Sequence, residues 1–242
     1  MSRTWTIARR ELASFFDSLI AYILLVVFLG VSGIFTWMLG SDVFLRGQAD
    51  LQAFFGIAYW ALYLFVPALT MRTLAEERRS GTLDLLLSRS VSDWQVVLGK
   101  FWASLLLIAI ALACTLPYYL TVAWLGDMDH GAAWSGYLAL FLLGAAYVSI
   151  GVYASSITDN QIVAFLVALT INTCLHLLLP FIAGNFTGVA GSVLEFLGTP
   201  QHFQSMGRGV VDSRDLLYFL SVVVLGLTAA EINLAKRGLK GS

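Results

Sequence analysis

Met71–Lys100, MRTLAEERRSGTLDLLLSRSVSDWQVVLGK, separates two long runs without a charged residue. It holds nine of the chain's 29 Asp, Glu, Lys and Arg residues, in a sequence that is 59% hydrophobic. Soluble domains carry about 25% charged residues, whereas this chain has 12%. The uncharged runs are long enough to cross a bilayer as helices, so the polar stretch between them must lie outside the membrane.

Outward from this stretch, the sequence predicts six membrane-spanning helices in one domain, residues 1–242. Helices are expected because lipid offers backbone polar groups no hydrogen-bonding partner, and the sequence lacks the ten-residue alternation of a membrane β-barrel. The predicted fold class is therefore an all-α membrane protein. The spans fall within Leu19–Leu39, Ala53–Met71, Phe101–Gly126, Gly131–Thr158 and Gln161–Gly184, and the sixth runs from Leu216 to include Glu231.

The positions of Lys and Arg predict the orientation. Eleven of them lie on one side of the six spans, and three, Arg46, Arg208 and Arg214, lie on the other. Cytoplasmic loops carry the excess of Lys and Arg, so both termini and residues 72–100 are predicted to be cytoplasmic. Residues 185–215 then form the longest periplasmic loop, and its apolar residues predict short helices that return towards the bundle.

The N-terminal residues 1–18 precede the first span. Trp5, Ala8, Leu12 and Phe15 recur at near-helical spacing, opposite Arg9 and Arg10. This pattern predicts an interfacial helix that lies flat on the inner face of the membrane. Contact with a cytoplasmic partner and simple anchoring in the membrane are both compatible with it.

Enzyme motifs are missing from the sequence. Gly99-Lys100 lacks the earlier glycine of a phosphate-binding loop, and His130, His176 and His202 show no metal-binding spacing. Cys114 and Cys174 each fall inside a span, and both are expected to serve as small apolar packing residues. We therefore expect no catalytic residue, no metal site, no bound cofactor and no nucleic-acid partner.

The polar stretch itself reads as a structured connection. Residues 73–80 are charged and compatible with a helix, Gly81 breaks it, and Thr82 can cap a short apolar run that starts at Leu83. We predict a short amphipathic helix across the inner face, which a partner could bind. Binding of anionic lipid head groups, or solvation of a helix end, is the alternative use of these charges.

Two blocks resemble a known family. AEERRSGTLDLLLSRSVSDWQVVLGK, Ala75–Lys100, resembles the signature of ABC-2 type exporter permeases. TPQHFQSMGRGVVDSRDLLYFLS, Thr199–Ser221, is similar to the branch of that family associated with gliding motility and nitrous-oxide-reductase maturation. The resemblance implies a dimer of six-span subunits in the bacterial inner membrane, formed by two copies or with a related permease. A membrane subunit with a periplasmic domain is a further partner in that branch.

The resemblance also implies the source of energy and the residues that receive it. A separate cytoplasmic ABC ATPase subunit, which binds ATP and Mg, would dock on the coupling loop, residues 72–100, and drive export. The matching coupling residues of this sequence are Glu76, Glu77, Arg78, Gly81, Thr82, Leu83 and Asp84.

Other polar residues are weaker candidates. Asn172 and His176 share one face of the fifth span, where they could line a translocation path or form interhelical hydrogen bonds. His202 and Arg208 could contact a periplasmic partner or serve only loop packing. An ATPase-independent secondary transporter or channel, or a scaffold that recruits a cytoplasmic protein, is the alternative function. The sequence does not identify the cargo.

Overall fold

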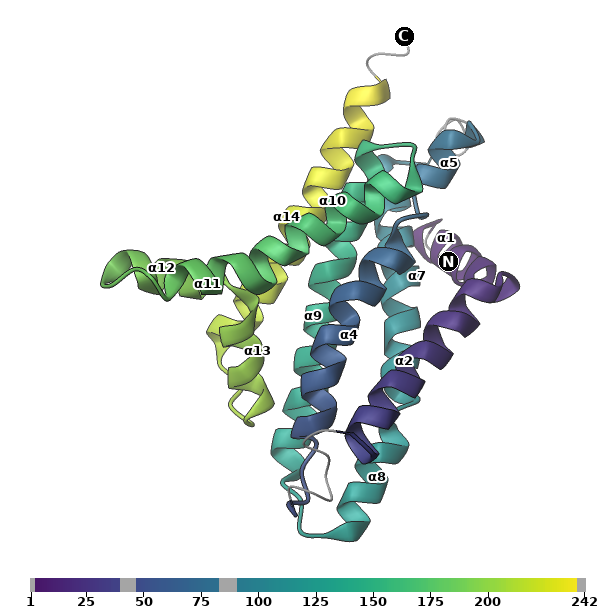
Figure 1. Ribbon diagram of the computed structural model, residues 1–242. Coiled ribbons are helices and arrows are strands. Elements are labelled where there is room, and N and C mark those ends of the chain that lie inside the picture. The colour runs from purple at the N-terminus through teal and green to yellow at the C-terminus, as the bar shows by residue number, and fades with distance from the viewer. Residues whose placement is uncertain (1–2, 40–46, 83–90, 239–242) are drawn as a thin grey trace.

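The computed structural model describes residues 3–39, 47–82 and 91–238, and in these ranges it contains helices and no strand (Figure 1). Six helical segments are long and apolar enough to cross a membrane, which confirms the predicted spans. They are α2 (Leu19–Trp37), α4 (Gln52–Thr70), α7 and α8 (Asp93–Ala113, Leu116–Leu125), α9 (His130–Ile157), α10, η1 and α11 (Gln161–Thr173, Cys174–Leu178, Leu179–Ala183), and α14 (Ser213–Gly238).

Helix α9 is the centre of the bundle and packs against α4, α7, α10, α13 and α14. Small residues on it allow this close packing, because helices in lipid associate through van der Waals contact of their backbones. A Cβ atom at Gly151 would overlap Thr70 Oγ1 of α4. On the other side, a Cβ at Gly226 of α14 would lie 2.6 Å from Ser149 Oγ of α9. The fold therefore depends on small residues at these crossings.

Two spans are interrupted. In the third span α7 ends at Ala113 and α8 begins at Leu116, next to Pro117, a residue that has no backbone N–H to continue the helix. In the fifth span α10 passes into η1, a π-helical turn that contains His176. In Figure 1 the chain from α10 to α12 leads away from the bundle towards the left of the view.

Shorter helices lie at one end of the bundle and along its side (Figure 1). One end, here called the α5 end, carries α1 (Arg3–Asp17) and α5 (Ala75–Arg79). α13 (Thr199–Gly207) packs on the side of α9, and the carbonyl of its last residue, Gly207, accepts a hydrogen bond from Gln52 at the start of α4, towards the opposite end of the bundle, here called the α8 end. α12 (Val189–Leu197) packs on α11. These helices confirm the helical N-terminal segment and the short helices predicted between the last two spans.

Candidate functional site

Helix α5 is fixed to the end of α9 by two consecutive serines. Ser155 Oγ accepts hydrogen bonds from the backbone N–H groups of Leu74 (3.0 Å) and Ala75 (2.9 Å). The carbonyl of Ser156 accepts a bond of 2.8 Å from Arg78 Nη1 and one of 2.6 Å from the side chain of Asn233 in α14. The first turn of α5 is thus bonded to α9, and through Ser156 it is linked to α14.

A buried ion cluster fixes α5 to α1 and α7. Lys100 of α7 is 1% exposed, and its Nζ lies 2.9 Å from Glu77 Oε1 of α5 and 3.1 Å from Glu11 Oε1 of α1. Arg10 Nη2 lies 3.8 Å from the same Glu77 oxygen but is 63% exposed. Removing one partner of a buried ion pair costs about 3–5 kcal/mol, whereas an exposed pair contributes about 0–1 kcal/mol. Lys100 is therefore the centre of the cluster, and Arg10 is peripheral.

Helix α1 lies directly against α7. A Cβ atom at Gly99 would be 2.6 Å from Ile7 Cγ2 of α1, so only glycine permits this approach. Ala8 and Phe15 of α1 are buried, as the apolar pattern of this helix predicts. Glu11, one helical turn after Ala8, points the same way and thereby reaches Lys100.

The turn after α5 remains exposed. Ser80 Oγ donates to the Glu76 carbonyl at 2.9 Å and lies 2.8 Å from Thr82 Oγ1. Gly81 has φ +71°, a left-handed conformation that costs a residue with a side chain about 1–2 kcal/mol, and the space around it is open. Of the predicted coupling residues in the described chain, Glu76, Gly81 and Thr82 are exposed, whereas Glu77 and Arg78 are half-buried against the bundle. Leu83, Asp84 and the predicted amphipathic helix that starts there lie outside the described residues.

Asn172 and His176 are both buried in the fifth span, at 0% and 2% exposure. His176 Nδ1 lies 2.5 Å from the Tyr147 hydroxyl of α9, which is the interhelical hydrogen bond considered for it. Its ring stacks on Tyr59 of α4, with centroids 4.0 Å apart and planes at 22°. Neither amide atom of Asn172 forms a hydrogen bond within the described chain. The π-helical turn brings His176 among the aromatic rings of α4.

His202 lies inside the protein. It is 2% exposed, its Nδ1 lies 2.7 Å from Asp215 Oδ1 of α14, and its Nε2 lies 2.7 Å from the Phe196 carbonyl of α12. The ring also stacks on Tyr218, with centroids 4.0 Å apart. His202 thus links α12, α13 and α14. Arg208 is exposed at the end of α13, so the predicted periplasmic contact stays a prediction.

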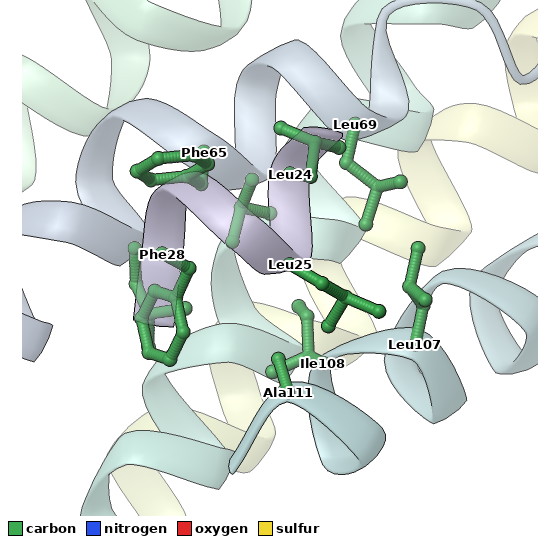
Figure 2. Close-up of a pocket in the computed structure, with 10 residues that line it drawn as sticks. Leu24, Leu25, Phe28, Phe65, Leu69, Leu107, Ile108 and Ala111 are labelled. Carbon is green, nitrogen blue, oxygen red and sulfur yellow. The ribbon is translucent and has the colours of Figure 1, made fainter. Parts of the chain in front are cut away.

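Hollow regions lie among the spans of the described chain, and three of them differ clearly in their lining. A space of about 40 Å³ between α2, α4 and α7 is lined only by hydrocarbon side chains, among them Leu24, Phe65 and Ile108 (Figure 2). A larger groove of about 950 Å³ runs along α14 between α9 and η1, with Arg214 at one end. The third, of about 530 Å³, lies between α4, η1 and α13 and includes Tyr59, His176 and Arg208. Only the last of these contains buried polar atoms without a partner in the described chain.

Sequence reasoning missed the residues that hold α5 in place. Ser155, Glu11 and Asp215 were not singled out, and Lys100 was considered only with Gly99, as a pair that lacks the rest of a phosphate-binding loop. One signal was available, because Glu11 falls on the same helical face as Ala8 and Phe15, where a charge requires a partner. For Lys100 no such signal exists, since a lysine at the start of a span normally faces water.

Comparison with protein-family models identifies the family of the chain. Residues 5–197 match the family described as "ABC-2 family transporter protein", and no curated protein matches the chain. The match spans α1, the first five membrane-crossing segments and α12, and thus includes the ion cluster and the turn at Gly81. A multi-pass permease with a structured element between its second and third spans agrees with this result. The chain belongs to the ABC-2 family of transporter proteins.

Proposed function

We propose that this chain is the membrane subunit of an ATP-driven exporter in the bacterial cytoplasmic membrane. A separate cytoplasmic ATPase subunit, which binds ATP and Mg, docks on the exposed turn after α5. The observation that carries the proposal is the attachment of α5 to three other helices through Lys100, Ser155 and Ser156. A force applied at the turn would reach α1, α7 and α9 together, which is what coupling to the conformational change of an ATPase requires.

The exposed residues of the turn are the proposed contact surface. Glu76, Arg79, Ser80, Gly81 and Thr82 are all exposed and combine charges of both signs with hydroxyl groups. Glu77 and Arg78 act differently in this proposal, because they connect the turn to the bundle and transmit movement. A charge reversal at Glu77 would leave Lys100 buried without its nearest carboxylate. The variant would therefore destabilise the fold, and a loss of ATPase binding could not be assigned to the docking surface.

We also propose that the permease is a dimer, formed by two copies or with a related permease. Large apolar side chains of α2 and α10, including Val26, Ile162 and Leu166, are exposed in the single chain. Asn172 and His176 are already buried within the single chain, so a translocation path that included them would lie inside the subunit, beside α4 and α9. The similarity of Thr199–Ser221 to the gliding-motility and nitrous-oxide-reductase-maturation branch supports a further membrane partner with a periplasmic domain.

A pair of glycine variants tests the coupling. Gly81 and Gly47 both have positive φ, +71° and +61°, and both have open space where a Cβ would be. Their conversion to valine therefore imposes a similar backbone strain, but only Gly81 lies beside α5. We expect Gly81→Val to reduce ATPase activity about tenfold or more in a complex with the ATPase encoded beside this chain, and Gly47→Val to leave it unchanged.

The measurement is ATP hydrolysis by the purified complex in lipid nanodiscs, together with the amount of ATPase that co-purifies. Equal losses in both variants would assign the effect to folding and contradict the proposed contact. Full activity of Gly81→Val, or failure of any ATPase to co-purify with the wild-type chain, would overturn the exporter assignment.

A further inference from the structure

The cavity between α4, η1 and α13, here called the aromatic cavity, has a volume of about 530 Å³. Four aromatic residues form much of its wall, namely Phe55, Tyr59, Trp60 and Phe203. Trp60 and Leu177, which also line it, are 47% and 40% exposed on the surface of the bundle. The cavity is therefore accessible from the side, where the hydrocarbon of a membrane would lie.

Two buried polar atoms in the wall lack partners within the described chain. Tyr59 is 8% exposed and its hydroxyl forms no hydrogen bond. His176 uses Nδ1 for the Tyr147 hydroxyl, but its buried Nε2 has no partner. Buried polar groups in proteins are nearly always hydrogen-bonded, so two unpaired groups on one cavity indicate that a polar molecule completes them.

A positive charge lies at the α8 end of the same cavity. Arg208 is exposed, and its Nε donates to the Gln204 carbonyl at 3.2 Å, which leaves the Nη groups for an anion. Gln52 Nε2 binds the carbonyl of Gly207, the residue before Arg208, at 2.8 Å. The residues that line the cavity include no Asp or Glu. Arginine binds phosphate and carboxylate groups through paired hydrogen bonds, and phosphate is the anionic group that membrane lipids offer.

The two polar ends of the cavity lie about two turns of α4 apart. Gln52, which fixes the Arg208 end, and Tyr59 are seven residues apart on α4, which corresponds to about 10 Å at 1.5 Å per residue. A head group must therefore place hydroxyls some distance beyond its phosphate. Aromatic rings suit such a group, because they can contact the apolar faces of a ring while its hydroxyls reach Tyr59 and His176.

We propose that the aromatic cavity binds an anionic lipid whose phosphate carries a polyhydroxylated ring. The phosphate contacts Arg208, the ring hydroxyls bond Tyr59 and His176, and the acyl chains leave past Trp60 and Leu177. A free sugar phosphate shares the polar chemistry, but the lateral opening and the apolar wall favour the lipid. Under the proposed function this lipid is cargo or a ligand on the transport path, whereas its binding needs no ATPase.

Lipid retention by the purified full-length permease tests the site. The chain, in detergent without ATPase or ATP, is equilibrated with phosphatidylinositol, phosphatidic acid or phosphatidylcholine of identical acyl chains, and bound lipid is counted by native mass spectrometry. We expect phosphatidylinositol to be retained about tenfold more than phosphatidylcholine and more than phosphatidic acid, which lacks the ring. Free inositol phosphate should compete poorly.

Two variants and a matched control locate the binding. Arg208→Gln should remove the preference for anionic lipid, whereas Arg214→Gln, an exposed arginine at the same end that does not line this cavity, should not. Tyr59→Phe removes only the unpaired hydroxyl, so it should fold and melt at or above the wild-type temperature while retaining about fivefold less phosphatidylinositol.

Several outcomes would overturn the site. These are equal retention of the three lipids, wild-type retention by both Arg208→Gln and Tyr59→Phe, or competition by free inositol phosphate as strong as by the lipid. Variants that changed only the proportion of dimers would show that a second subunit covers the cavity instead. Because the assay contains no ATPase, selective retention by a chain that binds no ATPase would refute the exporter assignment and leave the lipid site standing.

Discussion

Helices α9 and α10 are consecutive and both cross the bundle, yet the chain buries them very differently. In the most apolar stretch of α9, 78% of the residues are buried, whereas in the most apolar stretch of the span that begins with α10 only 22% are buried. The mean hydropathy of these stretches runs the other way, at 1.8 for α9 and 2.3 for the span that begins with α10. The more apolar helix is thus the less buried one. Among membrane helices small residues mark contact between helices, whereas large aliphatic side chains such as Ile162 and Leu166 face lipid or another subunit.

The largest effect is expected when volume is added to the buried helix α9. Gly151→Val would place side-chain atoms where Thr70 of α4 lies, and the two helices would have to separate. We expect the folded state to lose about 3 kcal/mol or more, with little folded protein recovered from detergent. The measurement is the yield of monodisperse protein on size-exclusion chromatography and its melting temperature.

The control for that variant is Gly30→Val, because Gly30 lies on the exposed side of α2 with no atom within 4 Å of an added Cβ. It should behave like the wild type. Comparable losses of folded protein from both variants would mean that valine in a span, and not the α9–α4 crossing, causes the defect.

A smaller effect is expected from removing volume. Leu140 of α9 is 0% exposed and Leu166 of α10 is 52% exposed. Leu140→Ala should leave a cavity and destabilise the protein by about 3 kcal/mol, whereas Leu166→Ala should change its stability by less than about 0.5 kcal/mol. Unfolding in a denaturing detergent titration measures both. If Leu166→Ala is as destabilising as Leu140→Ala, α10 is already covered in the purified protein, which would reveal a stable dimer.

The smallest effect on stability is expected from removing the side chains that cap the N-termini of α9 and α10. Asp129 caps α9 by accepting from the Ala132 N–H, and Asn160 caps α10 by accepting from the Ile162 N–H at 2.9 Å. Either change to alanine should cost about 1 kcal/mol. Because α9 is the centre of the bundle, Asp129→Ala should lower the melting temperature of the whole protein.

For Asn160→Ala we expect instead faster amide hydrogen exchange confined to the first turn of α10 and an unchanged melting temperature. Hydrogen exchange by mass spectrometry on both variants separates the two responses. A global loss of protection in Asn160→Ala would show that α10 folds as one unit with α9, against the difference proposed here.

The number and order of the spans could be predicted from the sequence, because length and the absence of charge are nearly sufficient for a helix in lipid. The helix of the N-terminal segment followed from the periodicity of its apolar residues. The π-helical turn around His176 could not be predicted, since it depends on how that ring packs against Tyr59 of another helix.

The details of the candidate site depend on contacts between distant segments. Lys100 lies at the edge of a polar stretch, where a lysine normally faces water, yet carboxylates from α1 and α5 allow it to be buried. His202 stands in a loop by sequence, and Asp215 of α14 draws it inside. In both cases the partner, which no local pattern identifies, determines where the charged or polar side chain lies.

The ion cluster has a consequence for the biosynthesis of the chain. Glu11 leaves the ribosome first, Glu77 follows, and Lys100, 89 residues after Glu11, emerges only as the third span begins to insert. Until then the two carboxylates have no common cation, so α1 cannot reach its final position. In a nascent chain halted before Lys100, α1 would be only loosely attached. Once Lys100 is added, its side chain can hold Glu11 of α1 and Glu77 of α5 together against α7.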